Sequence, residues 1–192
     1  MLAQLRSYPN LLTLLRLGFV PFVVNSILDA HYGIALTLFI LAGVSDGLDG
    51  LLARSLSQRT KLGEYLDPIA DKLLISTLFL VLSVMHRLPW RVTVVVLGRD
   101  LIILIVCTLV YATTSLRDFR PTLLGKANTV AQILTLGATI LVEVAPWFWV
   151  AVAKTIGIWT VFSLTIVSAL HYVYLLGVRL HSATERSSGK PA

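Results

Sequence analysis

Four aspartates stand at regular intervals between positions 46 and 71 of a chain that is otherwise rich in apolar side chains. On a helix, positions three or four apart lie on one face, so each half of this segment would present its special residues together. Carboxylates gathered in this way repel one another where water is scarce, unless cations lie between them. Oxygen-only ligands suit Mg, Mn or Ca, so the segment predicts a divalent-metal site. The residues that define the spacing are Asp46, Asp49, Gly50, Ala53, Arg54, Gly63, Asp67 and Asp71.

The smaller and basic residues of this spacing favour a substrate that contains phosphate. Metal ions held by few carboxylates usually complete their coordination shells with substrate phosphates, and a pair of ions can bind both the attacking and the leaving oxygen. Gly50 and Gly63 have no side chain to keep a nucleotide or its diphosphate away from the helix, and Ala53 has only a small one. Arg54 offers a planar fork of donors that matches phosphate oxygens. Phosphoryl-transfer chemistry is therefore the favoured interpretation, and four aspartates suffice for two ions.

Two other interpretations of the aspartates are a purely structural cluster of ion pairs and a divalent-metal transporter. Four acids against Arg54 and Lys72 leave a net negative charge, which counts against a structural cluster. A transport path needs polar residues through to the opposite side of the membrane, whereas the outer halves of the expected spans are almost wholly apolar. Arg54 would also oppose the binding of a cation as cargo. We therefore prefer an enzyme.

The elements that must position these residues are long apolar segments, because 56% of the chain is hydrophobic. Each segment is near the roughly 20 residues that a helix needs to cross a bilayer, and short polar turns separate them. We expect an all-α, polytopic membrane protein with a bundle of six transmembrane helices, a membrane domain at 1–178 and a frayed polar C-terminal tail at 179–192. The expected spans are 11–28, 34–52, 66–85, 92–113, 123–144 and 148–176.

The distribution of basic residues predicts how these spans are oriented. If the N-terminus is cytoplasmic, that side collects most of the Lys and Arg residues, and the other side receives chiefly Arg87, Arg91 and Lys154. We expect a multi-pass protein of the cell (inner) membrane with both termini and the aspartates on the cytoplasmic side. The net charge of +6 then reflects topology and attraction to anionic membrane lipids rather than binding of nucleic acid.

The order D-x2-D-G-x2-A-R-x8-G-x3-D-x3-D resembles the signature of the CDP-alcohol phosphatidyltransferase family at every position. The segments PNLLTLLRLGFVPF, LDPIADK, GRD and GKANTVAQ look like those of members that make phosphatidylglycerophosphate or cardiolipin, so the resemblance covers most of the chain. It implies metal-dependent transfer of a phosphatidyl group from CDP-diacylglycerol to an alcohol acceptor, with release of CMP. It also implies a homodimer.

The resemblance further implies a role for each residue of the motif. Asp46, Asp49 and Asp67 would bind two metal ions, Mg or Mn, and Asp71 would contribute to the same site. Asp71 would also be the general base that takes the proton from the acceptor hydroxyl, whose oxygen then attacks the phosphorus bearing the diacylglycerol. The residues implied to bind CDP-diacylglycerol are Asp49, Gly50, Ala53, Arg54 and Gly63.

Basic residues outside the motif are candidates for binding the acceptor. Lys126, Arg99 and Arg120 could hold an anionic group, although positive-inside anchoring explains Lys126 equally well and an interhelical salt bridge explains Arg99. Arg99 and Asp100 are adjacent and point to different sides of a helix, so we expect each to need another partner rather than to neutralise the other. Asn10, Thr13 and Arg16 share a stripe that either lines the cavity or packs helices together.

The acceptor alcohol is less clearly specified than the donor, because the motif handles the donor alone. The LDPIADK segment and the chain length look like phosphatidylglycerophosphate synthases, which use glycerol 3-phosphate. The GRD and KANT segments look like cardiolipin synthases that use phosphatidylglycerol. We predict glycerol 3-phosphate as the acceptor, with phosphatidylglycerol as the alternative.

Overall fold

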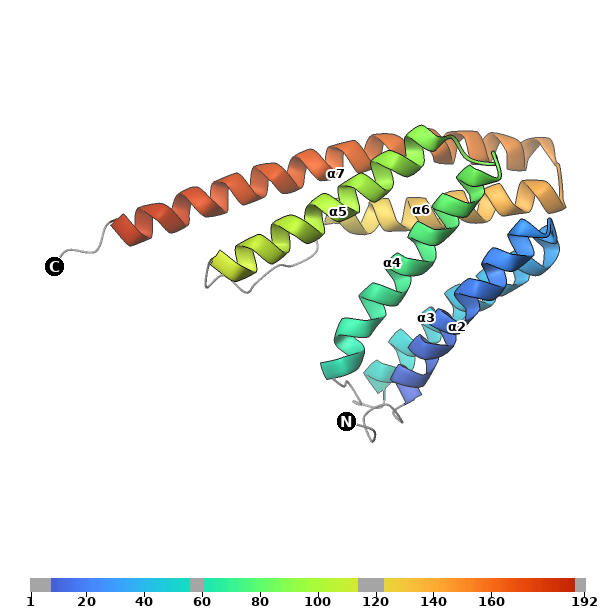
Figure 1. Cartoon of the computed structure of the whole chain (residues 1–192), viewed down its shortest axis with the longest axis horizontal. Helices are drawn as coiled ribbons and strands as arrows, with labels where there is room; N and C mark the ends of the chain where they lie inside the picture. Colours follow the sequence, from blue (N-terminus) through green and yellow to red (C-terminus); the bar gives the residue numbers. More distant parts are fainter. Residues whose placement is uncertain (1–7, 56–60, 114–122, 189–192) are drawn as a thin grey trace.

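The computed structural model describes the backbone of residues 8–55, 61–113 and 123–188, and the side chains of residues 16–45, 70–105 and 123–174. All regular secondary structure in these ranges is α-helical, which confirms the all-α part of the expected fold class. Long apolar sequences without internal turn signals explain the helices, since a helix satisfies its own backbone where water is scarce. The six helices are α2 (Tyr8–Leu28), α3 (Tyr32–Ser55), α4 (Lys61–Val84), α5 (Trp90–Thr113), α6 (Leu123–Val144) and α7 (Phe148–Ser188) (Figure 1).

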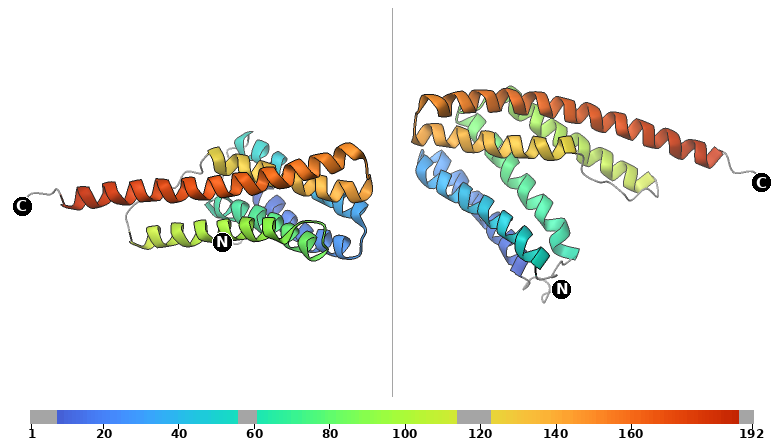
Figure 2. Two further views of the ribbon diagram at one scale, coloured as in Figure 1. Left: turned by 90° about the horizontal axis from the view of Figure 1, so that it is seen from above. Right: turned by 180° about the vertical axis from the view of Figure 1, so that it is seen from behind.

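Successive helices run in opposite directions, so their connections gather at two ends of the molecule. The short turns at 29–31, 85–89 and 145–147 lie at one end, which we call the turn end. The last residues of α3 and the first residues of α4 lie at the other, which we call the motif end (Figure 2). Away from the turn end, α2, α3 and α4 diverge from α5 and α7 (Figure 1).

Left-handed residues end two of the helices at the turn end. Ala30 and His86 have φ angles of 57° and 56°. The amide of the following residue then donates back to the carbonyl five positions earlier, His31 to Ser26 and Arg87 to Leu82. This arrangement satisfies carbonyls that the end of a helix leaves without partners. The same local solution therefore stops α2 and α4.

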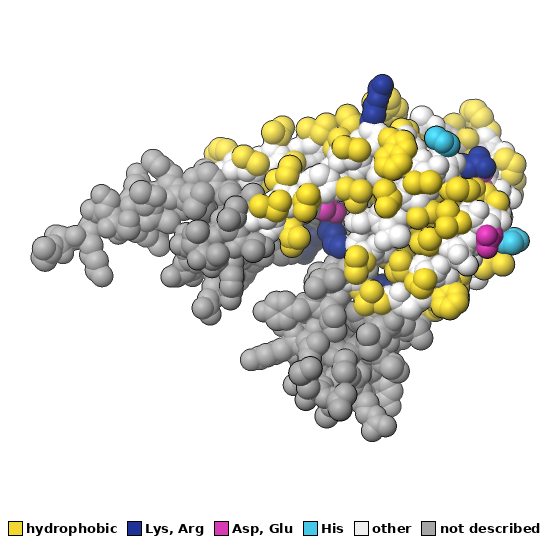
Figure 3. Space-filling view, viewed as in Figure 1, with side chains coloured by type: hydrophobic (Ala, Val, Ile, Leu, Met, Phe, Trp, Pro, Cys, Tyr) yellow, Lys and Arg dark blue, Asp and Glu magenta, His cyan; other side chains and the backbone are white. Residues whose placement is uncertain are grey.

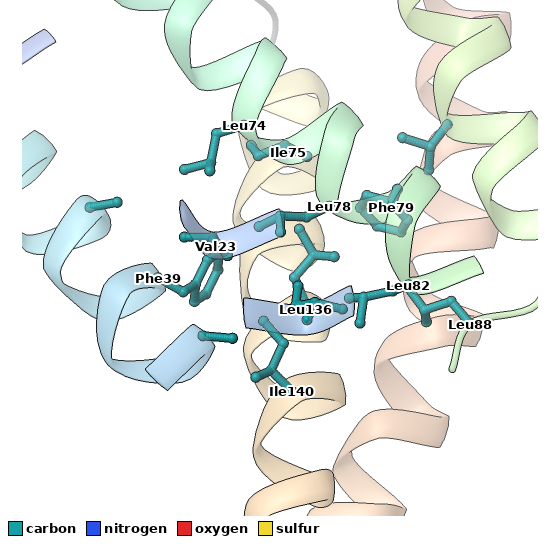
Figure 4. Close-up of a cluster of buried hydrophobic side chains, with 14 of the residues drawn as sticks. Val23, Phe39, Leu74, Ile75, Leu78, Phe79, Leu82, Leu88, Leu136 and Ile140 are labelled. Carbon is teal, nitrogen blue, oxygen red and sulfur yellow. The ribbon is translucent and has the colours of Figure 1, made fainter. Parts of the chain in front are cut away.

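A buried apolar cluster holds α2, α3, α4 and α6 together near the turn end. Val23, Phe39, Leu78, Leu136 and Ile140 point into it from these four helices (Figure 4). Large apolar side chains are also exposed on the outer faces of the helices, among them Phe22, Leu101 and Trp149. Exposed apolar surface of this extent is typical of contact with lipid.

A second group of contacts at the turn end is polar. The guanidinium of Arg87 forms a salt bridge from Nη1 to Glu143 Oε2 at 3.1 Å and donates from Nε to the hydroxyl of Tyr32 at 3.3 Å. The hydrogen bond to Tyr32 and the charge of Glu143 raise the pKa of Arg87 above its usual value. These contacts join α3, the α4–α5 turn and α6 where the helices converge.

Two helices of the described part are long and apolar enough to cross a membrane, at Leu123–Val144 and Phe148–Tyr174. Shorter apolar stretches occupy Arg16–Leu28 and Tyr32–Ser45. The observed helices begin and end close to the expected spans, but crossing by all six stays a prediction. α7 continues to Ser188, so the start of the expected polar tail is helical rather than frayed.

Candidate functional site

The aspartate motif lies on the two helices that meet at the motif end. Asp46, Asp49, Gly50, Ala53 and Arg54 occupy the last turns of α3, and Gly63, Asp67 and Asp71 occupy the first turns of α4. Residues 56–60 alone connect the helices, which limits the separation of Ser55 and Lys61 to about 20 Å. The backbone therefore brings both halves of the motif to one end of the molecule. Apart from Asp71, the side chains of the motif lie outside the described residues.

The side chain of Asp71 contacts α2. Its Oδ1 accepts a hydrogen bond from Nη1 of Arg16, whose side chain is only 2% exposed. A buried guanidinium is costly unless a carboxylate and hydrogen bonds compensate its charge. The Asp71 side chain is 40% exposed, so this carboxylate also faces outward from the ion pair. The contact ties α2 to the motif helix and is compatible with both interpretations of Arg16 from the sequence.

A carboxylate ligand set on α3 and α4 fits a hard divalent ion by its chemistry, because every donor is oxygen. Within the described side chains no group of three His, Cys, Asp or Glu residues converges. Asp46, Asp49 and Asp67 are outside that part, so the metal site itself stays a prediction. Asp71, half-exposed at the same end, is compatible with it.

Beside Asp71, Lys72 begins a charged network that joins α4, α5 and α7. Lys72 Nζ donates to Asp100 Oδ1 at 2.6 Å, and Arg99 Nη1 donates to the same oxygen at 2.8 Å. Arg99 Nη2 donates to Ser168 Oγ of α7 at 2.8 Å. The expectation that Arg99 and Asp100 do not neutralise each other is therefore wrong. Their Cα–Cβ bonds do diverge, but the long arginine side chain reaches back to its neighbour, and each residue also has the interhelical partner that we expected.

The candidate acceptor residues have different surroundings. Lys126 is exposed in the first turn of α6, at the end of that helix that lies away from the turn end (Figure 1). The side chain of Arg99 is 8% exposed, and its guanidinium already donates to Asp100 and Ser168. Arg120 lies outside the described residues.

A buried polar stripe runs along α6 and was not expected from the sequence. Asn128 and Gln132 are fully buried, and Asn128 Oδ1 accepts a hydrogen bond from Thr165 Oγ1 of α7 at 3.0 Å. Thr135 and Thr139 continue the stripe and bond their hydroxyls to carbonyls one turn earlier. The spacing of four, three and four residues was the signal that could have revealed it, because that spacing keeps polar groups on one helix face.

Comparison with known proteins identifies the family to which this chain belongs. A sequence profile of CDP-alcohol phosphatidyltransferases matches residues 6–177. This chain belongs to the CDP-alcohol phosphatidyltransferase family. The match confirms the resemblance that the aspartate motif indicated, and it covers all six helices apart from the last part of α7.

Relatives within the family carry two different names. A probable phosphatidylglycerophosphate synthase of Mycobacterium tuberculosis is 33% identical over 178 residues, which cover 89% of this chain and 82% of that protein. The human cardiolipin synthase (CMP-forming) is 33% identical over 153 residues, which cover 70% of this chain. A probable cardiolipin synthase (CMP-forming) of Drosophila melanogaster is 31% identical over 187 residues. The chain spans 50% of the human protein and 58% of the fly protein.

Proposed function

We propose that this protein transfers a phosphatidyl group from CDP-diacylglycerol to glycerol 3-phosphate, releasing CMP and forming phosphatidylglycerophosphate. The observation that carries this proposal is the complete aspartate motif on adjoining ends of α3 and α4 in a member of the CDP-alcohol phosphatidyltransferase family. The choice of acceptor rests on the similarity to the M. tuberculosis protein, which extends over most of both chains.

The donor would be held by the residues of the motif. Asp46, Asp49, Asp67 and Asp71 would hold two Mg or Mn ions, which when bound would offset the charge of the donor diphosphate. Arg54 would add a planar pair of donors to the same phosphates. The residues that would line the nucleotide pocket are Asp49, Gly50, Ala53, Arg54 and Gly63.

Asp71 would act on the acceptor. Its carboxylate would take the proton from the acceptor hydroxyl as the oxygen attacks the phosphorus that bears the diacylglycerol. A new phosphorus–oxygen bond forms to the acceptor, and the bond between this phosphorus and the oxygen of CMP breaks. Because Arg16 is buried and bonded to Oδ1, it would fix the orientation of this carboxylate.

Lys126 is the best placed of the cations proposed to bind the acceptor phosphate. It is exposed and lies in the first turn of α6, whereas Arg99 is buried and already bonded. Arg120 precedes α6 in the chain and would add positive charge near it. An ammonium at this place would attract a small anionic alcohol toward the motif end.

The membrane arrangement belongs to the same proposal. All six helices would cross the cell membrane, with both termini and the motif end on the cytoplasmic side and a membrane domain at 1–178. The protein would act as a homodimer, as the family resemblance implies. A soluble acceptor could then reach the motif directly, while the donor remains in the bilayer.

Cardiolipin synthesis from CDP-diacylglycerol and phosphatidylglycerol is the second candidate function. The similarity to the human cardiolipin synthase, at the same identity over 153 residues, favours it. The two functions share the donor and the motif and differ only in the acceptor.

One experiment separates these functions. Purified protein in mixed micelles would receive CDP-diacylglycerol, Mg or Mn, and either glycerol 3-phosphate or phosphatidylglycerol, and lipid products would be identified by mass. We expect phosphatidylglycerophosphate. Cardiolipin formed from phosphatidylglycerol, with glycerol 3-phosphate inert, would replace our proposal with the second candidate. Failure to release CMP with either acceptor would exclude both.

A further inference from the structure

Asp100 is an acidic residue outside the aspartate motif, and it lies at the centre of the network that joins α4, α5 and α7. Its Oδ1 accepts hydrogen bonds from Lys72 Nζ at 2.6 Å and from Arg99 Nη1 at 2.8 Å. We propose that Asp100 is a positioning residue for the transfer reaction, which holds Lys72 in a fixed place beside the anionic group of the acceptor while the buried Arg99 is bonded to the same carboxylate oxygen. This inference rests on the transferase activity proposed above.

Burial explains why Arg99 depends on Asp100. The side chains of Arg99 and Asp100 are only 8% and 13% exposed. A guanidinium in such surroundings needs a carboxylate close by, since removing one partner of a buried pair leaves an uncompensated charge. Arg99 Nη2 also donates to Ser168 Oγ, so contacts to α5 and α7 together fix the plane of the guanidinium. Asp100 therefore decides both the charge balance and the orientation of Arg99.

Lys72 depends on Asp100 in a different way. Its side chain is 40% exposed, and it directly follows Asp71 on α4. A lysine this exposed samples many rotamers unless its ammonium is held. The bond to Asp100 holds the ammonium and at the same time links the motif helix to α5.

The charges of the three residues sum to one positive charge. Two cations that share one carboxylate oxygen attract a further anion, because Asp100 offsets only one of them. Figure 3 shows an acidic and a basic side chain next to each other, among hydrophobic side chains, on this face of the molecule. An anionic acceptor bound near α4 and α5 would be stabilised by this net charge, and its place would depend on where Asp100 holds the cations.

Kinetics of Asp100→Asn test the positioning role, because asparagine keeps the shape and loses the charge. We expect the acceptor KM to rise about ten- to hundredfold although the net charge becomes more positive, because cations that Asp100 no longer holds lose their charge-assisted contacts to the acceptor. Donor KM and kcat should change far less. Asp100→Glu restores the charge and should recover much of the acceptor KM. Glu143→Gln makes the same acid-to-amide change in the Arg87 salt bridge at the turn end, and should leave the acceptor KM unchanged.

A second measurement does not depend on activity. Spin labels would be attached to cysteines at Leu73 of α4 and Ile105 of α5, both exposed, after Cys107→Ala removes the native thiol. We expect the distance distribution between the labels to broaden in Asp100→Asn and to stay narrow in Asp100→Glu. Lys72→Met, which buries no charge, should raise the acceptor KM even if Asp100→Asn fails to fold.

Each result supports or overturns the positioning role. An unchanged acceptor KM in Asp100→Asn, or an equal loss in donor KM and kcat, would overturn it. An unchanged distance distribution between the spin labels in Asp100→Asn would also overturn it. If the unaltered protein makes no phosphatidylglycerophosphate, the proposed acceptor is wrong; the KM test then uses whichever alcohol reacts. If no alcohol reacts, the transferase proposal fails, and the positioning role fails with it whatever the label distances.

Discussion

At the scale of single residues, Asp71 joins the proposed chemistry to the described contacts of the fold. The same carboxylate that would serve the metal site and the acceptor proton is bonded to the buried Arg16. The family motif specifies Asp71 but says nothing of Arg16, which lies 55 positions earlier in the chain. A guanidinium at this place orients one oxygen of the carboxylate, and the removal of either charge would disturb the other residue.

Asparagine at Asp46, Asp49 or Asp67 should abolish transfer while the helices remain folded. The amide keeps the shape of the side chain and loses the charge that a divalent ion requires. CMP release from CDP-diacylglycerol measures the loss, and chelation of Mg or Mn should reproduce it in the unaltered protein. Substantial transfer by any of the three variants would remove that aspartate from the proposed metal site.

Asp71→Asn should lower kcat more than it weakens donor binding. A base that acts only in the chemical step contributes to the transition state and little to the bound donor. Binding of CDP-diacylglycerol, measured beside turnover, separates the two effects. If donor binding is lost together with turnover, Asp71 is chiefly a metal ligand.

Lys126→Ala should raise the KM for glycerol 3-phosphate by about one to two decades. The lost contact between ammonium and phosphate is charge-assisted and worth roughly 1.5 to 3 kcal/mol. Arg91→Ala removes an exposed cation at the turn end and is the matched control. An acceptor KM that changes equally in both variants would indicate a general effect of charge.

At the scale of the helices, α6 and α7 approach closely because Gly157 has no side chain. A Cβ at Gly157 would lie 2.6 Å from Thr135 Oγ1 and 3.3 Å from Thr135 Cβ. Small residues allow helix backbones to pack closely in membranes, where the hydrophobic effect does not drive helices together. Thr135 belongs to the buried polar stripe of α6, so α7 packs directly on that stripe at Gly157.

Gly157→Ala should therefore destabilise the protein by about 1 to 3 kcal/mol, the usual cost of overpacking. Thr135 is short and branched, so it cannot move aside as a long side chain would. Gly43→Ala is the control, since nothing lies within 4 Å of a Cβ there. Thermal unfolding in detergent compares the two, and equal melting temperatures would show that α7 shifts to accommodate the methyl group.

The sequence predicted the helices well and their contacts poorly, for a physical reason. Apolar runs and polar turns determine where a helix begins and ends, so all six helix ends at the turn end were expected within two residues. The partners of Arg16, Lys72 and Asp100 depend on how helices pack, which spacing along one helix does not contain. The family motif identified the aspartates because their order is fixed within a single segment of the chain.

At the scale of the whole molecule, the proposed topology places the turn end outside the cell. A cysteine at His31, exposed at the turn end, should react with a membrane-impermeant maleimide on intact cells. A cysteine at Ala127, exposed in the first turn of α6, should react only after the membrane is permeabilised. Both variants need the Cys107→Ala background. The opposite labelling pattern would invert the topology and place the motif away from cytoplasmic nucleotides.

The divergence of α2, α3 and α4 from α5 and α7 affects how the donor would arrive (Figure 1). The proposed membrane arrangement puts these separating helices in the bilayer, so a diacyl lipid would present its head group to the motif while its tails stay among other lipids. The donor and the enzyme would then meet by diffusing within the plane of the membrane. Diluting CDP-diacylglycerol with neutral detergent at constant bulk concentration should slow the reaction, because the enzyme would respond to the mole fraction of donor at the surface of the micelle.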